Sequence, residues 1–159
     1  MQEVYEKPLT ESEARSLTVR DIMSYPVVTA KDKTSIREIA KLMKKHNVDA
    51  VVITDKTSVP VGIITEGDIV RRLVSTKRNL WFVKAGHIMS KPLITVSRDM
   101  SLEEAARFMA EKKVKKLCVV DESRKLLGML TTEDITKNAG YLINVLEEVI
   151  HTGYYAGLL

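Results

Sequence analysis

Gly62-Ile-Ile-Thr65-Glu-Gly-Asp68-Ile69 returns 66 residues later as Gly128-Met-Leu-Thr131-Thr-Glu-Asp134-Ile135. These stretches close a longer internal repeat, because residues 19–71 align without a gap on residues 85–137. Fifteen of the 53 aligned pairs are identical, and most other apolar positions face apolar residues. The pattern indicates a tandem duplication, and the fold is therefore interpreted copy by copy.

Each copy carries the same predicted elements. A short extended stretch, 27–30 or 93–96, leads to an amphipathic helix that Ser35 or Ser101 caps. Glu38 and Glu104 follow three residues later and complete a capping box in each copy. Two strands come next, predicted at 50–54 and 61–65 and again at 117–120 and 127–131, before a second helix opens at Glu66 or Thr132.

The resulting unit, β-α-β-β-α, has roughly 55 residues and is too small to bury its own apolar face well. Two such units packed together solve this problem. We therefore expect an α/β (α+β) fold with a pseudo-two-fold axis and two related clefts. The first copy spans 19–71 and the second 85–137.

Three segments lie outside the repeat. The N-terminal extension, 1–18, should contain a short helix that starts at the capping box Thr10-Glu-Ser-Glu13. The linker, 72–84, holds Trp81 and Phe82 among basic residues, and we expect these aromatics to pack onto the module. Residues 138–159 should form a further helix and a tail, with one apolar side made of Leu142, Val145, Leu146 and Val149.

The overall composition is that of an ordinary globular chain. Its 25 basic and 21 acidic residues give a net charge of +4, too small to indicate a dedicated nucleic-acid binder. The only cysteine, Cys118, excludes an internal disulfide and a multi-cysteine zinc site. The apolar runs have the length of strands, and the N-terminus is polar. We expect a cytoplasmic protein that does not enter a membrane.

The duplicated order, the openings Asp21-Ile-Met-Ser24 and His87-Ile-Met-Ser90, and the two G-h-h-T-x-x-D-I endings resemble a tandem pair of CBS domains, also called a Bateman module. The resemblance covers residues 19–137 and implies a stand-alone CBS pair. It also implies regulatory binding of an adenosine-type ligand (AMP, ADP, ATP or S-adenosylmethionine) in the clefts, with no required cofactor. Members commonly form disc-like dimers, so a homodimer is expected.

The resemblance assigns the ligand contacts. In the first site, Thr65 and Asp68 hold the ribose and phosphate, and Ser24 and Pro26 lie beside the adenine. In the second site, Thr131 and Asp134 hold the ribose and phosphate, and Ser90 and Pro92 lie beside the adenine. The residue chemistry agrees, since a carboxylate accepts from two ribose hydroxyls and a helix start offers free N–H groups to a phosphate. The alternative is that Thr-x-x-Asp is only a helix cap, and that each Pro only shapes the entry to a strand.

The copies differ in charge just before the middle strand. The second copy has Lys115 and Lys116 where the first has Asp49 and Ala50. In the gamma regulatory subunits of AMP-activated protein kinase, positions matching these often carry a His-Arg pair that reaches phosphates. The resemblance therefore adds Lys115 and Lys116 to the first site, which should be the tighter one for a phosphorylated ligand. The alternative is a solvated basic turn.

Catalysis is not expected. The chain has no P-loop, GxGxxG, GxSxG or HExxH pattern, and its three histidines are scattered. Cys118 lies in an apolar strand, which is typical of an inert core thiol. The competing function is a constitutive dimerisation scaffold with vestigial clefts. In either case the apolar helix of 142–149 could bury against a second copy, an unidentified protein partner or its own module, and nucleic acid is not expected.

Overall fold

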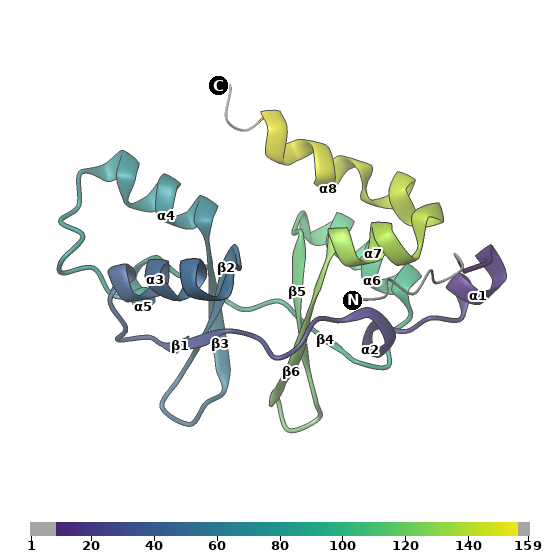
Figure 1. Ribbon diagram of the computed structural model, residues 1–159, viewed down its shortest axis with the longest axis horizontal. Helices are drawn as coiled ribbons and strands as arrows, with labels where there is room; N and C mark the ends of the chain where they lie inside the picture. Colours follow the sequence, from purple (N-terminus) through teal and green to yellow (C-terminus); the bar gives the residue numbers. More distant parts are fainter. Residues whose placement is uncertain (1–8, 156–159) are drawn as a thin grey trace, which may run out of the picture. The chain divides into compact units, whose positions relative to one another are not determined.

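The computed structural model describes residues 9–155 (Figure 1). The elements of the first half are α1 (Glu11–Arg15), α2 (Val19–Ile22), β1 (Thr29–Lys31), α3 (Ile36–His46), β2 (Ala50–Thr54), β3 (Pro60–Thr65), α4 (Glu66–Arg72) and the 3-10 turn η1 (Val74–Thr76). Those of the second half are α5 (Ala85–Ile88), β4 (Thr95–Ser97), α6 (Leu102–Lys112), β5 (Lys116–Val120), β6 (Leu126–Thr131), α7 (Thr132–Asn138), η2 (Gly140–Leu142) and α8 (Ile143–Tyr155).

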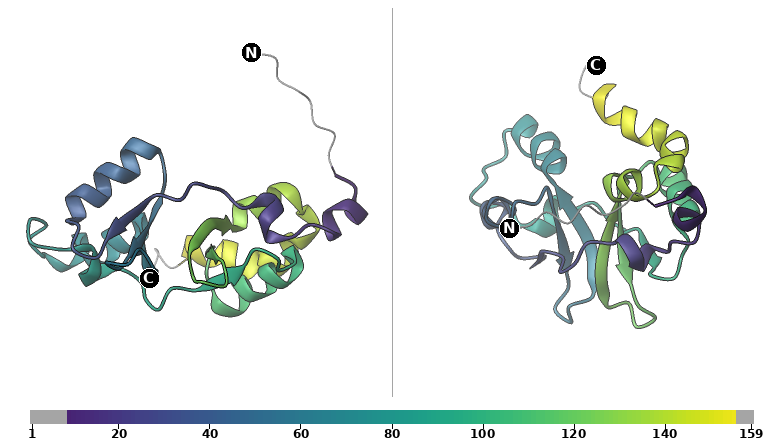
Figure 2. Two further views of the ribbon diagram at one scale, coloured as in Figure 1. Left: turned by 90° about the horizontal axis from the view of Figure 1, so that it is seen from below. Right: turned by 45° about the vertical axis from the view of Figure 1, so that its right-hand side comes forward.

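The strands form two three-stranded sheets, and the predicted mixed fold is confirmed. Strand β1 runs parallel to β2, and β2 runs antiparallel to β3 with Val52 opposite Ile63. The second sheet has the order β4-β5-β6, and each sheet has one hairpin, β2–β3 or β5–β6 (Figure 2). Strands β1 and β4 begin two residues later than predicted and have three residues each.

The backbone repeats with the same offset as the sequence. The C-cap residue of α3, Asn47, has φ 51°, and that of α6, Lys113, has φ 54°. The hairpin turns likewise place Ser58 and Arg124, also 66 residues apart, in the left-handed region. The capping box predicted at Ser101 and Glu104 forms, while Ser35 accepts from the Glu38 amide without the reciprocal bond. The duplication is therefore a property of the fold.

The chain forms two compact units that do not coincide with the two copies. Unit 1 holds residues 9–24, 96–119 and 129–155, and unit 2 holds residues 25–95 and 120–128. The opening segment of each copy thus belongs to the unit built around the other copy's helices. This exchange was not predicted.

The core of unit 2 shows what holds the exchanged segment. Val83, Ala85 and Ile88 are buried in one cluster with the apolar side chains of α3, β2 and β3. Backbone hydrogen bonds fasten the same segment, because Ile36 donates to Val83 O at 3.1 Å and Ala85 donates to Thr34 O at 2.8 Å. Burial of three apolar residues, at about 1.5–3 kcal/mol for each large side chain, makes this segment part of the core.

Unit 1 repeats the arrangement with residues from the start of the chain. The amide of Val19 donates to Met100 O at 2.9 Å, and the Val19 side chain is fully buried. Helix α2 contacts α7. The predicted capping box at Thr10 and Glu13 forms at the start of α1.

Helix α8 packs against α6 and α7 in unit 1 (Figure 1). Leu146 and Val149 of α8 and Leu142 of the preceding turn η2 are buried as the sequence predicts, and Val145 is half-buried. The side chains of Tyr154 and Tyr155 lie outside the described residues. Nowhere in 9–155 does a helix have the length and apolar character needed to cross a bilayer.

The two linker aromatics stay largely exposed, but one of them contacts the module. Trp81 and Phe82 are 67% and 76% exposed. The guanidinium of Arg37 lies 3.9 Å from the Trp81 ring centroid and covers one face of the ring. The expected packing on the module is thus seen for Trp81, through Arg37 of α3, and the linker enters the core of unit 2 at Val83.

Candidate functional site

Thr65 and Asp68 form a reciprocal cap at the start of α4. The Asp68 amide donates to Thr65 Oγ1 at 3.2 Å, and the Thr65 amide and hydroxyl donate to Asp68 Oδ2 at 2.9 and 3.1 Å. The amide of Glu66 also has a partner, the carbonyl of Asp49 at 3.0 Å. The cap interpretation is therefore confirmed, and two of the amides expected to be free for a phosphate are already bonded.

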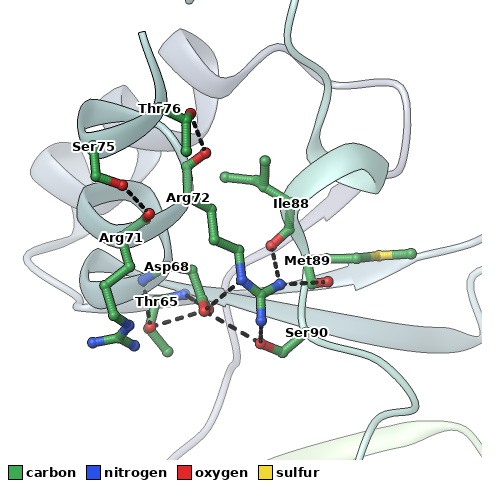
Figure 3. Close-up of polar contacts among 9 residues, drawn as sticks. All are labelled: Thr65, Asp68, Arg71, Arg72, Ser75, Thr76, Ile88, Met89 and Ser90. Atoms are coloured by element: carbon green, nitrogen blue, oxygen red, sulfur yellow. Dashed lines mark hydrogen bonds and ion pairs between the residues drawn. The ribbon is translucent and has the colours of Figure 1, made fainter. Parts of the chain in front are cut away.

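The cap leaves the second oxygen of Asp68 for another partner. Oδ1 accepts a hydrogen bond of 3.2 Å from the Ser90 hydroxyl and lies 3.7 Å from Nε of Arg72 (Figure 3). Asp68 is only 5% exposed. A carboxylate so deeply buried needs charged and hydrogen-bonding partners, and Arg72, Ser90 and Thr65 supply them.

Ser90 reaches Asp68 because its segment pairs with β3. The amide and carbonyl of Ser90 exchange hydrogen bonds of 2.8 and 3.1 Å with Ile63. Gly62 permits this close approach, since a Cβ there would lie 2.7 Å from the Met89 sulfur and 3.0 Å from Ser90 O. The glycine of the G-h-h-T motif is thus explained by the incoming segment of the other copy.

The second Thr-Asp pair repeats the cap but has a different environment. The Thr131 amide and hydroxyl each donate to Asp134 Oδ2 at 2.8 Å, and the Asp134 amide donates to Thr131 Oγ1 at 3.1 Å. Asp134 is half-buried. Ser24 pairs with Met129 on β6, and within residues 9–155 its hydroxyl makes no hydrogen bond to Asp134.

The grouping of the two serines differs from the expected one. Ser90 was assigned with Thr131 and Asp134, but the structure places it on Asp68. Ser24 was assigned with Thr65 and Asp68, but its backbone pairs with Met129, which lies two residues before Thr131. The reason is the exchange of opening segments, which carries each serine to the other unit's Thr-Asp pair.

The remaining assigned residues are two prolines and two lysines. Pro26 is exposed and lines a pocket of about 340 Å³ with Val27, Val28, Thr29, Leu42, His46 and Val48. Pro92 is exposed two residues after Ser90. Lys115, whose carbonyl accepts from Thr132, and Lys116 belong to unit 1, so their assignment to the Asp68 site stays a prediction.

Arg72 is a candidate functional residue that the sequence analysis does not assign to either site. Its guanidinium touches Asp68 and the exchanged segment together (Figure 3). The sequence repeat could have pointed to this residue. The offset of 66 residues pairs Arg72 with Asn138, so only the first copy has a positive charge at this position.

The thiol of Cys118 is buried in strand β5. Burial raises the pKa of the Cys118 thiol to about 12. Among the described residues, no group of three or more His, Cys, Asp or Glu side chains could hold a metal ion. The candidate site around Asp68 consists of the Thr65 and Ser90 hydroxyls, one buried carboxylate and one guanidinium.

The family model "CBS domain" matches residues 19–75 and again residues 85–140. One similar protein is the uncharacterized protein MK0525 of Methanopyrus kandleri, 39% identical over 134 residues that make up 84% of this chain and 68% of that protein. Another is the L-aspartate semialdehyde sulfurtransferase of Methanocaldococcus jannaschii, 35% identical over 122 residues, 77% of this chain but 23% of that enzyme.

Two solved structures share the fold. The CBS domain pair of protein MJ0100, in complex with 5′-methylthioadenosine and S-adenosyl-L-methionine, is 34% identical with a TM-score of 0.69, and the match covers 79% of this chain and 97% of that one. The CBS domain protein PAE2072 from Pyrobaculum aerophilum, complexed with AMP, is 25% identical with a TM-score of 0.73 and coverages of 82% and 99%.

Proposed function

Because the chain belongs to the CBS domain family, we propose that it is a non-catalytic regulatory module that binds adenosine-containing ligands of the AMP, ADP or ATP class. Ligand occupancy would change the geometry of a homodimer or of a partner surface and so report energy or metabolite state, with the cytoplasm as the expected location. The complexes of MJ0100 and PAE2072 with adenosine compounds support this ligand class.

The observation that carries the proposal is the buried Asp68 carboxylate with hydroxyls on both sides. Oδ2 accepts from Thr65 and Oδ1 accepts from Ser90. A vicinal diol of ribose offers hydroxyl donors of the same kind, and Oδ1 has acceptor capacity for one of them beside the Ser90 hydroxyl. We infer that the ribose adds a hydrogen bond to a carboxylate whose existing partners stay in place.

Calorimetry tests the proposal on the purified chain, with AMP, ADP, ATP, NAD, 5′-methylthioadenosine and S-adenosylmethionine as separate titrants. We expect saturable binding of at least one of them, and weaker binding in Asp68→Ala. Failure of every titrant at millimolar concentration would favour the alternative function, a constitutive scaffold with vestigial sites. Turnover of a titrant that Asp68→Ala abolishes would show an enzyme instead.

The same proposal includes a homodimer, and the helical faces of the two units differ in how much apolar surface they offer. In unit 1, α8 covers α6 and α7, and Ala106 and Ile135 are fully buried. The equivalent residues 66 positions earlier belong to unit 2, where Ala40 is exposed and Ile69 is half-buried. They line an open groove of about 560 Å³ between α3 and α4, with Met43, Lys44, Asn47, Val48, Asp49, Glu66 and Val70.

This groove is suited to a second copy of the chain. Val70 at its edge and Val74 just beyond α4 are 58% and 69% exposed. Lys44 on α3 and Glu66 on α4 give the groove both signs of charge, which a two-fold interface requires because the patch must complement itself. The α3–α4 face, and not the face covered by α8, is therefore our proposed dimer interface.

A further inference from the structure

We propose that Arg72 is a positioning residue that assembles the Asp68 site in advance of ligand, and that no residue between 9 and 155 does the same at the Asp134 site. The inference rests on the proposed function for its ligand, but its structural part stands on contacts within unit 2 alone. Arg72 joins α4 to the turn Ile88–Ser90, the segment that unit 2 receives from the second copy (Figure 3).

One guanidinium makes all of these contacts. Nη1 donates to Ile88 O at 2.7 Å and to Met89 O at 3.1 Å, and Nη2 donates to Ser90 Oγ at 3.2 Å. Nε lies 3.7 Å from Asp68 Oδ1. The rigid fork of five N–H donors explains how a single side chain can serve three consecutive residues and a carboxylate, which a lysine ammonium could not match in geometry.

The two carbonyls that Arg72 binds need a donor. Helix α5 has four residues, Ala85–Ile88, so the carbonyls at its end lie beyond the reach of its own amides. The Ile88 side chain is buried in the core of unit 2 and anchors the turn from the other side. Arg72 thus completes the hydrogen bonding of a turn whose next residue, Ser90, touches Asp68.

The internal repeat provides a natural comparison. The residue equivalent to Arg72 is Asn138, whose Nδ2 donates to Asp134 O, a carbonyl of its own helix, at 2.8 Å. In unit 1, the opening segment is joined to β6 by the Ser24–Met129 backbone bridge, as Ser90 is joined to Ile63 in unit 2. The side-chain link between helix and turn is therefore a property of the Asp68 site.

Arg71 is the matched control on the same helix. Its guanidinium lies over Gly67, where an added Cβ would be 2.8 Å from both Nη atoms, and Figure 3 shows it directed away from the turn. Arg71→Asn and Arg72→Asn remove the same charge from adjacent positions, and only Arg72→Asn removes the link. The second substitution also reproduces the residue that unit 1 carries at this position.

The first test needs no ligand. Amide hydrogen exchange is measured on the wild type, Arg72→Asn and Arg71→Asn, at the amides of Ile63 and Ser90 that form the backbone bridge. Loss of hydrogen bonds that involve a charged donor should speed exchange at both amides by about tenfold or more in Arg72→Asn, and leave Arg71→Asn unchanged. Equal exchange in all three proteins would overturn the positioning role.

The second test adds calorimetry with AMP on the same proteins. We expect Arg72→Asn to bind AMP about tenfold more weakly and Arg71→Asn to bind it as the wild type does. Weaker AMP binding without faster exchange would mean that Arg72 contacts the ligand itself, which contradicts the inference. If the wild type binds no adenosine compound, the proposed function fails, and the exchange measurement still decides the structural claim.

Asn138→Arg keeps the inference testable if Arg72→Asn does not fold. The substitution places a guanidinium at the equivalent position of unit 1, where Ser24 and Met129 exchange backbone hydrogen bonds of 2.9 and 3.0 Å. We expect slower amide exchange at Ser24 and Met129. Unchanged or faster exchange at both would count against the inference, because an arginine there would not position the opening segment.

Discussion

The hydroxyl of Ser90 donates a hydrogen bond of 3.2 Å to Asp68, although the two residues come from different copies of the repeat. The Thr65–Asp68 cap is local to one copy, but its environment is completed by the opening segment of the other. Neither copy alone would therefore build this site. The duplication therefore has a structural role, since each unit contains the opening segment of the other copy.

Asp68→Ala should weaken AMP binding on the order of tenfold to a hundredfold, because loss of a hydrogen bond to a charged group costs about 1.5–3 kcal/mol. Asp134→Ala is the matched control. It removes an equivalent capping carboxylate but should leave the tighter AMP phase nearly intact. Calorimetry of both variants measures the effect, and the reverse ranking would mean that Asp134 marks the stronger site.

How well the sequence predicts the structure differs between local and long-range features. The capping boxes at Thr65 and Thr131, the second helices and the strands beside them form at the predicted residues, since hydrophobic period and cap chemistry act over a few residues. The direct contact of Ser90 with Asp68 was not predicted, because the two residues were assigned to different ligand sites. Both serines are equivalent in sequence, so no local pattern tells which pair each one joins.

Val70→Glu should convert the proposed homodimer to monomer. The charge would stand at the edge of the apolar α3–α4 groove and would be desolvated on association. Ile143→Glu is the control, because Ile143 is also exposed, at 47%, but lies on α8 in unit 1. Light scattering at micromolar concentration measures the mass against 17.9 kDa per chain. Dissociation by Ile143→Glu alone would place the interface on the α8 face.

Cys118 should resist alkylation in the folded protein. Burial raises the pKa of its thiol to about 12, so at pH 8 the reactive thiolate would be only about one part in ten thousand. We expect no iodoacetamide modification of the native chain over hours and full modification in urea, measured by intact mass. Reaction of the native thiol at a rate near that of a free cysteine would contradict the burial. If that reaction also abolished ligand binding, Cys118 would have a role in binding and would not be only a core residue.

Lys113→Gly should stabilise the protein. Lys113 is the C-cap residue that follows α6, and its φ of 54° and ψ of 43° are left-handed. Its amide donates to Ala110 O, so the end of the helix fixes this conformation. The left-handed conformation costs a residue with a Cβ roughly 1–2 kcal/mol, and glycine avoids this cost but loses more backbone entropy on folding. We therefore expect the free energy of unfolding to rise by about 0.5–1 kcal/mol.

Two substitutions nearby test the reason for this gain. Lys113→Asn should stabilise less than glycine but more than lysine, because asparagine tolerates the left-handed region and already occupies the equivalent position, Asn47, in the first copy. Lys112→Gly removes the same charge one residue earlier, inside α6, and should destabilise by up to about 1 kcal/mol. Urea unfolding of the three variants measures the free energies. A gain in Lys112→Gly equal to that in Lys113→Gly would show that relief of charge crowding in the basic run Lys112–Lys116, and not backbone conformation, is the cause.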